Sequence, residues 1–191
     1  METRLLLVSH AATPAMRAAR FPANDPLDAR GLAEAAAAQT HLSLPPDAAA
    51  FVSPATCARE TAAALALNAT LATELADLDY GAWHGKRLAD LAAEAPHELA
   101  AWTRDPEADA HGGESFSGLV KRVGRWLDSR AAASDAARTV IGVTHAPVVR
   151  AAIVHALGAS PDLFRRIEIG PLSVIELRHS ARGWTWWPAS R

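Results

Sequence analysis

The sequence has little cysteine, little net charge and no long hydrophobic run. Its single cysteine, Cys57, excludes an internal disulfide and a cluster of thiolate metal ligands, and is typical of a reducing compartment. The formal net charge is −2, with acidic and basic residues interspersed, which gives no basic patch of the kind that binds nucleic acid. We therefore expect no nucleic-acid partner.

No apolar stretch approaches the length that crosses a membrane. The N-terminus carries Glu2 before a short apolar run, and no small-residue cleavage pattern follows, which does not match a signal peptide. We therefore predict a cytoplasmic protein with no membrane association. Half of its 191 residues are hydrophobic, and no repeat or linker interrupts them, so residues 1–191 are expected to form a single globular domain.

Two apolar segments have the pattern of strands buried on both faces. Residues 5–8 form a continuous apolar run, and residues 139–144 are rich in β-branched and apolar side chains. A histidine lies just beyond each segment, His10 in one case and His145 in the other. Because ligands of open α/β sheets bind beyond the carboxyl ends of strands, these histidines are predicted to mark a site.

The rest of the chain alternates helix and strand patterns and ends in strands. Helices are predicted over residues 29–42 with Asp28 as the N-cap, 56–67, 88–102 with a break at Pro96, from 114 onward, and over 146–157. Further strands are predicted over residues 50–53, 166–169, 173–178 and 184–187, with loops over 14–26, 71–85 and 103–113. This order predicts an α/β fold, a three-layer α/β/α sandwich with a mostly parallel central sheet.

The C-terminal strand pattern is rich in tryptophan. Trp184, Trp186 and Trp187 alternate so that two of them share one face of the sheet. This placement favours core packing or a contact in a homodimer over a ligand-binding box.

Three residues suggest a nucleophile, its partner and an acid. A neutral imidazole can attack phosphorus and become a phosphohistidine, while amides at the start of a helix hold phosphate oxygens. Glu114 opens a predicted helix after Gly112-Gly113, where a carboxyl group can protonate a leaving oxygen and later accept a proton from water. Structural interpretations stay open, because strand ends often carry a polar residue and helix dipoles favour a glutamate in the first turn.

Six short segments follow one another in an order that is typical of one known superfamily. They are Ser9-His10-Ala11-Ala12-Thr13, Arg20 to Gly31, Ser53 to Ala62, Asp77 with Gly81, Trp83 and Gly85, Gly113-Glu114-Ser115, and Val143-Thr144-His145 to Arg150. In register, these segments resemble the histidine phosphatase superfamily, also called phosphoglycerate mutase-like.

The resemblance implies a phosphatase-type hydrolase that acts on a small phosphorylated metabolite. In this interpretation His10 is the nucleophile, Glu114 the general acid and His145 the partner that steadies the transferred phosphate. The short chain favours a phosphatase over a mutase. No cofactor and no metal is implied, and a zinc site made of His10, His145 and Glu114 has no close-spaced ligand pair to support it.

Two residues depart from the family pattern. Ser9 and Cys57 stand where the family has arginines that clamp the phosphate, and neither side chain can supply a planar charged fork. Each lost contact is worth about 1.5–3 kcal/mol. The alternative is therefore a catalytically weak member that binds a ligand, or one that acts on a less anionic substrate. The predicted substrate-binding residues are Ser9, Thr13, Arg17, Arg20, Cys57, His84, His111 and Ser115, with Arg17 and Arg20 as candidates for restoring positive charge.

Overall fold

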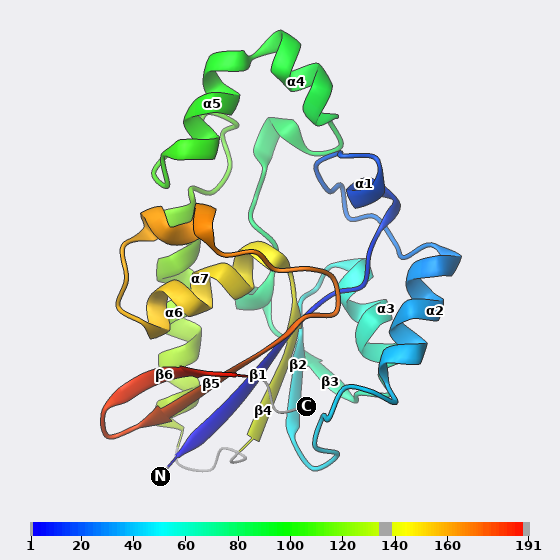
Figure 1. Cartoon of the computed structure of the whole chain (residues 1–191), viewed down its shortest axis with the longest axis vertical. Helices are drawn as coiled ribbons and strands as arrows, with labels where there is room; N and C mark the ends of the chain where they lie inside the picture. Colours follow the sequence, from blue (N-terminus) through cyan, green and yellow to red (C-terminus); the bar gives the residue numbers. More distant parts are fainter. Residues whose placement is uncertain (1, 134–138, 189–191) are drawn as a thin grey trace.

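The central element of the fold is a six-stranded sheet in the order β3-β2-β4-β1-β5-β6 (Figure 1). The computed structural model describes residues 2–133 and 139–188. The parallel strands are β1 (Thr3–Ser9), β2 (Ala49–Val52), β3 (Ala69–Leu71) and β4 (Thr139–Thr144). Strands β5 (Val174–Ser180) and β6 (Gly183–Trp187) add an antiparallel edge beside β1.

Helices cover both faces of this sheet, which confirms the predicted three-layer α/β/α sandwich. One face carries α6 (Phe116–Ala132) and α7 (Ala146–Ala156), and the other carries α2 (Ala29–Ala38) and α3 (Thr56–Ala64) (Figure 1). Beyond the carboxyl ends of the parallel strands lie α1 (Pro14–Arg17), α4 (Leu88–Glu94) and α5 (Pro96–Arg104). The 3-10 helices are η1 (Thr73–Leu75), η2 (Gly81–Trp83) and η3 (Pro161–Arg166).

The hydrophobic core is divided between the two faces of β1. Leu5 and Leu7 pack into the cluster that contains α6 and α7, whereas Leu6 and Val8 pack with residues of α3. Because successive side chains of a strand point to opposite faces, a strand between two helical layers needs apolar residues throughout. This explains the continuous apolar run at residues 5–8.

One predicted helix boundary is confirmed and another is shifted, and the local cause of each is visible. Pro96 separates α4 from α5, because proline cannot donate the backbone hydrogen bond that would continue a helix. Ser115 is the N-cap of α6 and accepts a hydrogen bond from the Gly118 amide at 3.1 Å. The helix therefore begins at Phe116 instead of Glu114.

Two local predictions were wrong, and one strand was not predicted. Residues 166–169 are not a strand, because the Ser160 cap and Pro161 start η3, and Arg150 Nε donates to the Ile167 carbonyl at 2.7 Å. The predicted loop at 14–26 contains α1, which Thr13 caps and Pro14 begins. Strand β3 was not predicted, since a three-residue edge strand carries too short a pattern.

The tryptophans of β6 have different environments. Trp184 packs against the core and its Nε1 donates to Asp128 Oδ1 at 3.0 Å, while the Arg178 guanidinium lies 4.2 Å from the centre of the Trp187 ring. Trp186 is 52% exposed. Core packing is thus confirmed for Trp184, and a homodimer contact stays a prediction.

The helices of the structure can be compared with the expectation that the chain does not cross a membrane. Over residues 2–133 and 139–188, none of the helices combines the length and apolar character required to cross a bilayer.

Candidate active site

The two strand-end histidines lie side by side. Strands β1 and β4 are neighbours with Ser9 opposite Thr144, and the His10 amide donates to the Thr144 carbonyl at 2.8 Å. The centres of the His10 and His145 rings are therefore only 4.9 Å apart. Both side chains are buried. The two histidines therefore lie together at the carboxyl ends of these strands, and a functional site made of them stays a prediction.

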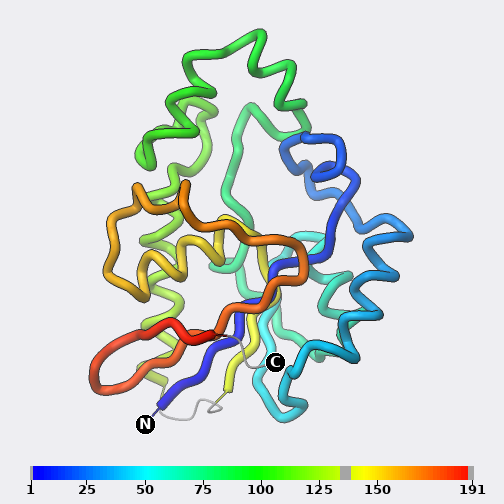
Figure 2. The backbone as a smooth tube through the Cα atoms, viewed as in Figure 1, coloured from blue at the N-terminus to red at the C-terminus, as the bar shows by residue number. Residues whose placement is uncertain are grey.

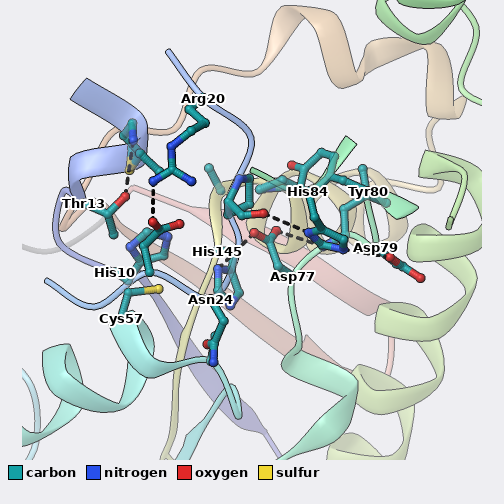
Figure 3. Close-up of a pocket in the computed structure, with 18 of the residues that line it drawn as sticks. His10, Thr13, Arg20, Asn24, Cys57, Asp77, Asp79, Tyr80, His84 and His145 are labelled. Atoms are coloured by element: carbon teal, nitrogen blue, oxygen red, sulfur yellow. Dashed lines mark hydrogen bonds and ion pairs between the residues drawn. The ribbon is translucent and has the colours of Figure 1, made fainter. Parts of the chain in front are cut away.

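The histidines line a cavity of about 460 Å³ (Figure 3). Its walls come from the loop after β1, the start of α3, the segment around η2 and the start of α7. The lining residues are His10, Thr13, Ala15, Met16, Arg20, Pro22, Asn24, Asp25, Ala55, Cys57, Asp77, Leu78, Asp79, Tyr80, His84, His145, Ala146, Pro147 and Arg150.

The environment of His10 keeps its imidazole neutral and fixes its tautomer. Burial, followed by the proximity of His145, lowers the pKa of His10 to about 4. The ring nitrogen Nδ1 lies 2.7 Å from the Ala11 carbonyl, which can only accept a hydrogen bond. Nδ1 therefore carries the proton, and Nε2 keeps the lone pair that a nucleophile needs.

His145 is held from one side only. Its Nε2 makes a 2.8 Å hydrogen bond with the hydroxyl of Ser53, a buried residue just after β2. Its buried Nδ1 has no hydrogen-bond partner among the described residues, although Asp77 Oδ2 lies 3.4 Å away. Burial, followed by the positive charge of Arg122, lowers the pKa of His145 to about 3. A neutral His145 with an unpartnered nitrogen is suited to contacting a bound group.

Asp77 supplies a carboxyl group that exchanges its proton near neutral pH. Burial raises the pKa of Asp77 to about 6, against the opposing effects of His10 and of the hydrogen bond that the Leu78 amide donates at 2.8 Å. The sequence analysis placed Asp77 in a family segment without giving it a role. Its signal was an acidic residue in an irregular loop next to the predicted site.

Glu114 requires a correction of placement, because it does not line the cavity. Arg122 binds both of its carboxylate oxygens, with Nε 2.9 Å from Oε1 and Nη2 2.6 Å from Oε2. The same guanidinium donates to the backbone carbonyls of Glu74, Ala76 and Asp77. The Glu114–Arg122 pair thus holds the segment that presents Asp77 to the cavity.

Four predicted substrate-binding residues do line the cavity: Thr13, Arg20, Cys57 and His84. Thr13 Oγ1 accepts from the Met16 amide, and Arg20 is paired with Asp25. His84 lies between the Pro22 carbonyl at 2.8 Å and Asp79 Oδ1 at 3.0 Å, and these acceptors raise the pKa of His84.

Four other predicted residues are not among those that line the cavity in the part of the chain that is described. Arg17 pairs with Asp28 at 3.1 Å on the surface, and Ser115 caps α6. His111 is buried against the Trp83 ring, 5.2 Å between centres, and Ser9 is buried within β1. The positive charge at the cavity therefore comes from Arg20 and from Arg150, which the sequence analysis did not single out.

Comparison with known structures first defines the class of protein. A mycobacterial glucosyl-3-phosphoglycerate phosphatase, solved in complex with VO3, superposes with a TM-score of 0.85 at 25% identity over 98% of this chain and 100% of that chain. The alpha-ribazole phosphatase from Shigella flexneri gives a TM-score of 0.85 at 22% identity over 99% of this chain and 96% of that chain. The fold is that of the phosphoglycerate mutase-like phosphatases.

The sequence comparison then gives the family. A model of the histidine phosphatase superfamily (branch 1) matches residues 5–187, so the chain belongs to that superfamily. The chain is also 32% identical over 183 residues to the bifunctional protein Rv2228c of Mycobacterium tuberculosis, which covers 91% of this chain and 50% of that protein. The chain thus spans about half the length of the curated relatives it matches.

Proposed function

We propose that this protein hydrolyses phosphomonoesters of small metabolites through a phosphohistidine on His10. The observation that carries the proposal is the state of His10: a buried, neutral imidazole whose Nδ1–H is held by the Ala11 carbonyl. Its Nε2 lone pair is free to attack phosphorus at a cavity that also contains a carboxyl group. The superfamily membership and the phosphatases among the structural neighbours support this reaction class.

In the first step, the Nε2 lone pair of His10 forms the N–P bond while the bond from phosphorus to the leaving oxygen breaks. Protonated Asp77 gives its proton to that oxygen, so that the product leaves as an alcohol. Asp77 takes this role in place of Glu114, because its carboxyl group lines the cavity and its pKa is about 6.

In the second step, water attacks the phosphohistidine and the Asp77 carboxylate accepts its proton, which releases phosphate and restores both residues. The unpartnered Nδ1 of His145 faces the same space and is placed to contact a phosphoryl oxygen. Arg20 and Arg150 line the cavity and provide positive charge for the substrate.

The test compares hydrolysis of a phosphomonoester panel by the wild-type protein, His10→Ala, Asp77→Asn and Glu114→Gln. The panel includes sugar phosphates and a ribazole-type phosphate, after the names of the structural neighbours. We expect no turnover by His10→Ala and a loss of about 10²–10⁴-fold in Asp77→Asn with alkyl leaving groups. The loss is smaller with p-nitrophenyl phosphate, whose leaving group needs no acid.

Glu114→Gln is the matched control for Asp77→Asn, since each change replaces a carboxyl group by its amide. We expect Glu114→Gln to keep the wild-type dependence on the leaving group. If Glu114→Gln shows the selective loss with alkyl phosphates and Asp77→Asn does not, the acid is Glu114 and the assignment to Asp77 is wrong.

The second candidate function is ligand binding, or action on a less anionic substrate. It is favoured by the charges at the cavity, since Arg20 is paired with Asp25 and Arg150 lies 3.5 Å from Glu168. This candidate would be supported if no phosphomonoester of the panel is hydrolysed and neither phosphate nor vanadate raises the melting temperature of the protein. Stabilisation by either anion would indicate an intact phosphate site.

A further inference from the structure

The proposed reaction gives no role to Cys57, a buried residue of the cavity. Cys57 lies in the first turn of α3, and its side chain is at the cavity next to the two histidines (Figure 3). Burial, followed by the negative charge of Asp77, raises the pKa of Cys57 to about 12. The free thiol is therefore a poor nucleophile in this site.

Cys57, His10 and His145 form a compact group of potential metal ligands. The Cys57 sulfur and one nitrogen of each ring all lie within 4.8 Å of one another. A tetrahedral Zn²⁺ site with bonds of about 2.0–2.3 Å spaces its ligand atoms roughly 3.3–3.8 Å apart. Small side-chain adjustments therefore bring the three atoms to bonding distance of one ion.

The two imidazoles are held as metal-binding histidines are usually held. His10 donates from Nδ1 to the Ala11 carbonyl, and His145 bonds through Nε2 to the Ser53 hydroxyl. Such second contacts fix the ring and leave the other nitrogen for the ion. On His145 that other nitrogen is Nδ1, which is buried without a hydrogen-bond partner among the described residues.

The Asp77 carboxylate lies beside one of these ligands and supplies negative charge. Its Oδ2 is 3.4 Å from His145 Nδ1. A thiolate and a carboxylate together balance a divalent cation, which removes the cost of burying an uncompensated charge. Two imidazoles and a thiolate form a ligand set that suits Zn²⁺ with a water molecule in the fourth position.

We propose that the cavity binds Zn²⁺ through His10, Cys57 and His145, with the Asp77 carboxylate as a nearby counter-charge, and, on the basis of the proposed function, that the bound ion blocks phosphoryl transfer. Binding removes the thiol proton of Cys57 to solvent, so each Zn²⁺ that binds releases a proton. The ion occupies the lone pair that His10 uses as a nucleophile. Zn²⁺ and a phosphohistidine therefore exclude one another.

The first test measures binding alone and does not depend on turnover. Protein stripped with a chelator is titrated with Co²⁺, a spectroscopic substitute for Zn²⁺, and the visible and near-ultraviolet spectra are recorded. We expect one Co²⁺ per chain, tetrahedral d–d bands and a thiolate-to-cobalt charge-transfer band, all displaced by Zn²⁺. Cys57→Ser should lose the charge-transfer band, and His145→Ala should bind at least tenfold more weakly.

The control is His155→Ala, which removes the surface pair between His155 and Asp128 and should leave the spectrum unchanged. Circular dichroism and thermal melting show whether each variant is folded, and Cys57→Ala, which removes the same sulfur, serves if Cys57→Ser does not fold. Octahedral spectra, no binding, or equal binding by the wild type and Cys57→Ser would overturn the proposal.

The second test asks whether the ion blocks the reaction. Micromolar Zn²⁺ should abolish hydrolysis of the best phosphomonoester, and chelation should restore it. Full activity of the Zn²⁺-loaded protein would disprove the proposal that the bound ion prevents phosphoryl transfer. A protein without any phosphatase activity would overturn the proposed function, while the cobalt spectra would still decide whether the metal site exists.

Discussion

At the scale of single residues, the pKa values of His10 and Asp77, which both line the cavity, are shifted in opposite directions. Burial lowers the pKa of His10 to about 4 and raises that of Asp77 to about 6. The same physical cause acts in opposite directions, because burial disfavours the charged form of each group. A neutral histidine and a protonated carboxyl group therefore coexist in the interval between these values, which is the combination that the first step needs.

This shift predicts an acidic pH optimum. His10 must be unprotonated, so activity rises with pH through about 4, and Asp77 must be protonated, so activity falls as pH rises through about 6. We expect kcat/KM to peak near pH 5 and to fall about tenfold per unit well above pH 6. A pH profile from 3 to 9 measures both limbs.

The control for this profile is Asp77→Asn, which should lose the alkaline limb and keep the acidic one. An optimum above pH 7, or an alkaline limb that survives in Asp77→Asn, would contradict the assignment. Glu114→Gln should keep both limbs, because its carboxyl group is bound to Arg122 away from the cavity.

The difference between Asp77 and Glu114 shows how far sequence reasoning reaches at this scale. The two histidines were predictable, because each lies just beyond a strand pattern and adjacent parallel strands end together. The choice between the two carboxyl groups as the proposed acid was not predictable, because both lie in segments whose paths the sequence does not reveal. The structure shows that Glu114 is engaged by Arg122, a residue of α6 that lies eight positions further along the chain.

At the scale of secondary-structure elements, β4 must pass close to its neighbours to align His145 with His10. Gly142 makes this possible: an added Cβ would lie 2.9 Å from Leu7 Cδ2 and 3.3 Å from Leu75 Cδ1. Both neighbours are fully buried, so they have little room to move.

We therefore expect Gly142→Ala to destabilise the protein by about 1–3 kcal/mol through overpacking. Urea unfolding followed by fluorescence measures the change in the free energy of unfolding. Gly118→Ala in α6 is the matched control, since its Cβ would meet atoms no closer than 3.4 Å. There the same substitution should be neutral or stabilising by up to about 1 kcal/mol. Equal effects at the two sites would show that the contacts around Gly142 are not limiting.

Elements were predictable where local sequence and tertiary packing agree. The strand patterns at residues 5–8 and 139–144 and the break at Pro96 are examples. Residues 166–169 alternate polar and apolar side chains like a strand, but the Ile167 carbonyl is taken by Arg150 instead of a neighbouring strand. A contact with a distant helix cannot be read from the local pattern.

At the scale of the whole molecule, residues 79–113 form an excursion. It extends away from the carboxyl ends of the strands and returns to its starting point. Figure 2 traces it in green away from the strands. At its base the Glu114 amide donates to the Asp79 carbonyl at 2.9 Å, and the Ala82 amide donates to the His111 carbonyl at 2.8 Å. The sequence predicted loops over 71–85 and 103–113 but not that they meet, because the pairing of two irregular segments leaves no periodic signal.

Gly113 controls this closure. An added Cβ would lie 2.1 Å from the Asp79 carbonyl oxygen, so Gly113→Ala forces the two segments apart. We expect a higher KM, because Asp79 and its neighbour Tyr80 line the cavity, and a loss of stability of about 3 kcal/mol or more. Steady-state kinetics and urea unfolding measure the two effects.

Gly112→Ala is the control for this change. Gly112 has a φ of +72°, but no described atom lies within 4 Å of its added Cβ. This variant should show only the cost of a left-handed alanine, about 1–2 kcal/mol, with an unchanged KM. If Gly112→Ala raises KM as much as Gly113→Ala does, substrate binding depends on the conformation of the loop and not on the contact between the two segments at the base of the excursion.

The closed base of the excursion also bears on how such a protein evolves. An insertion, deletion or exchange of sequence within residues 82–110 begins and ends at nearly one point in space, so it need not shift the register of the strands that carry His10 and His145. Tyr80 and His84, at the start of the excursion, line the cavity. Lineages that share this scaffold can therefore diversify in substrate preference by rewriting one segment while inheriting the reactive centre unchanged.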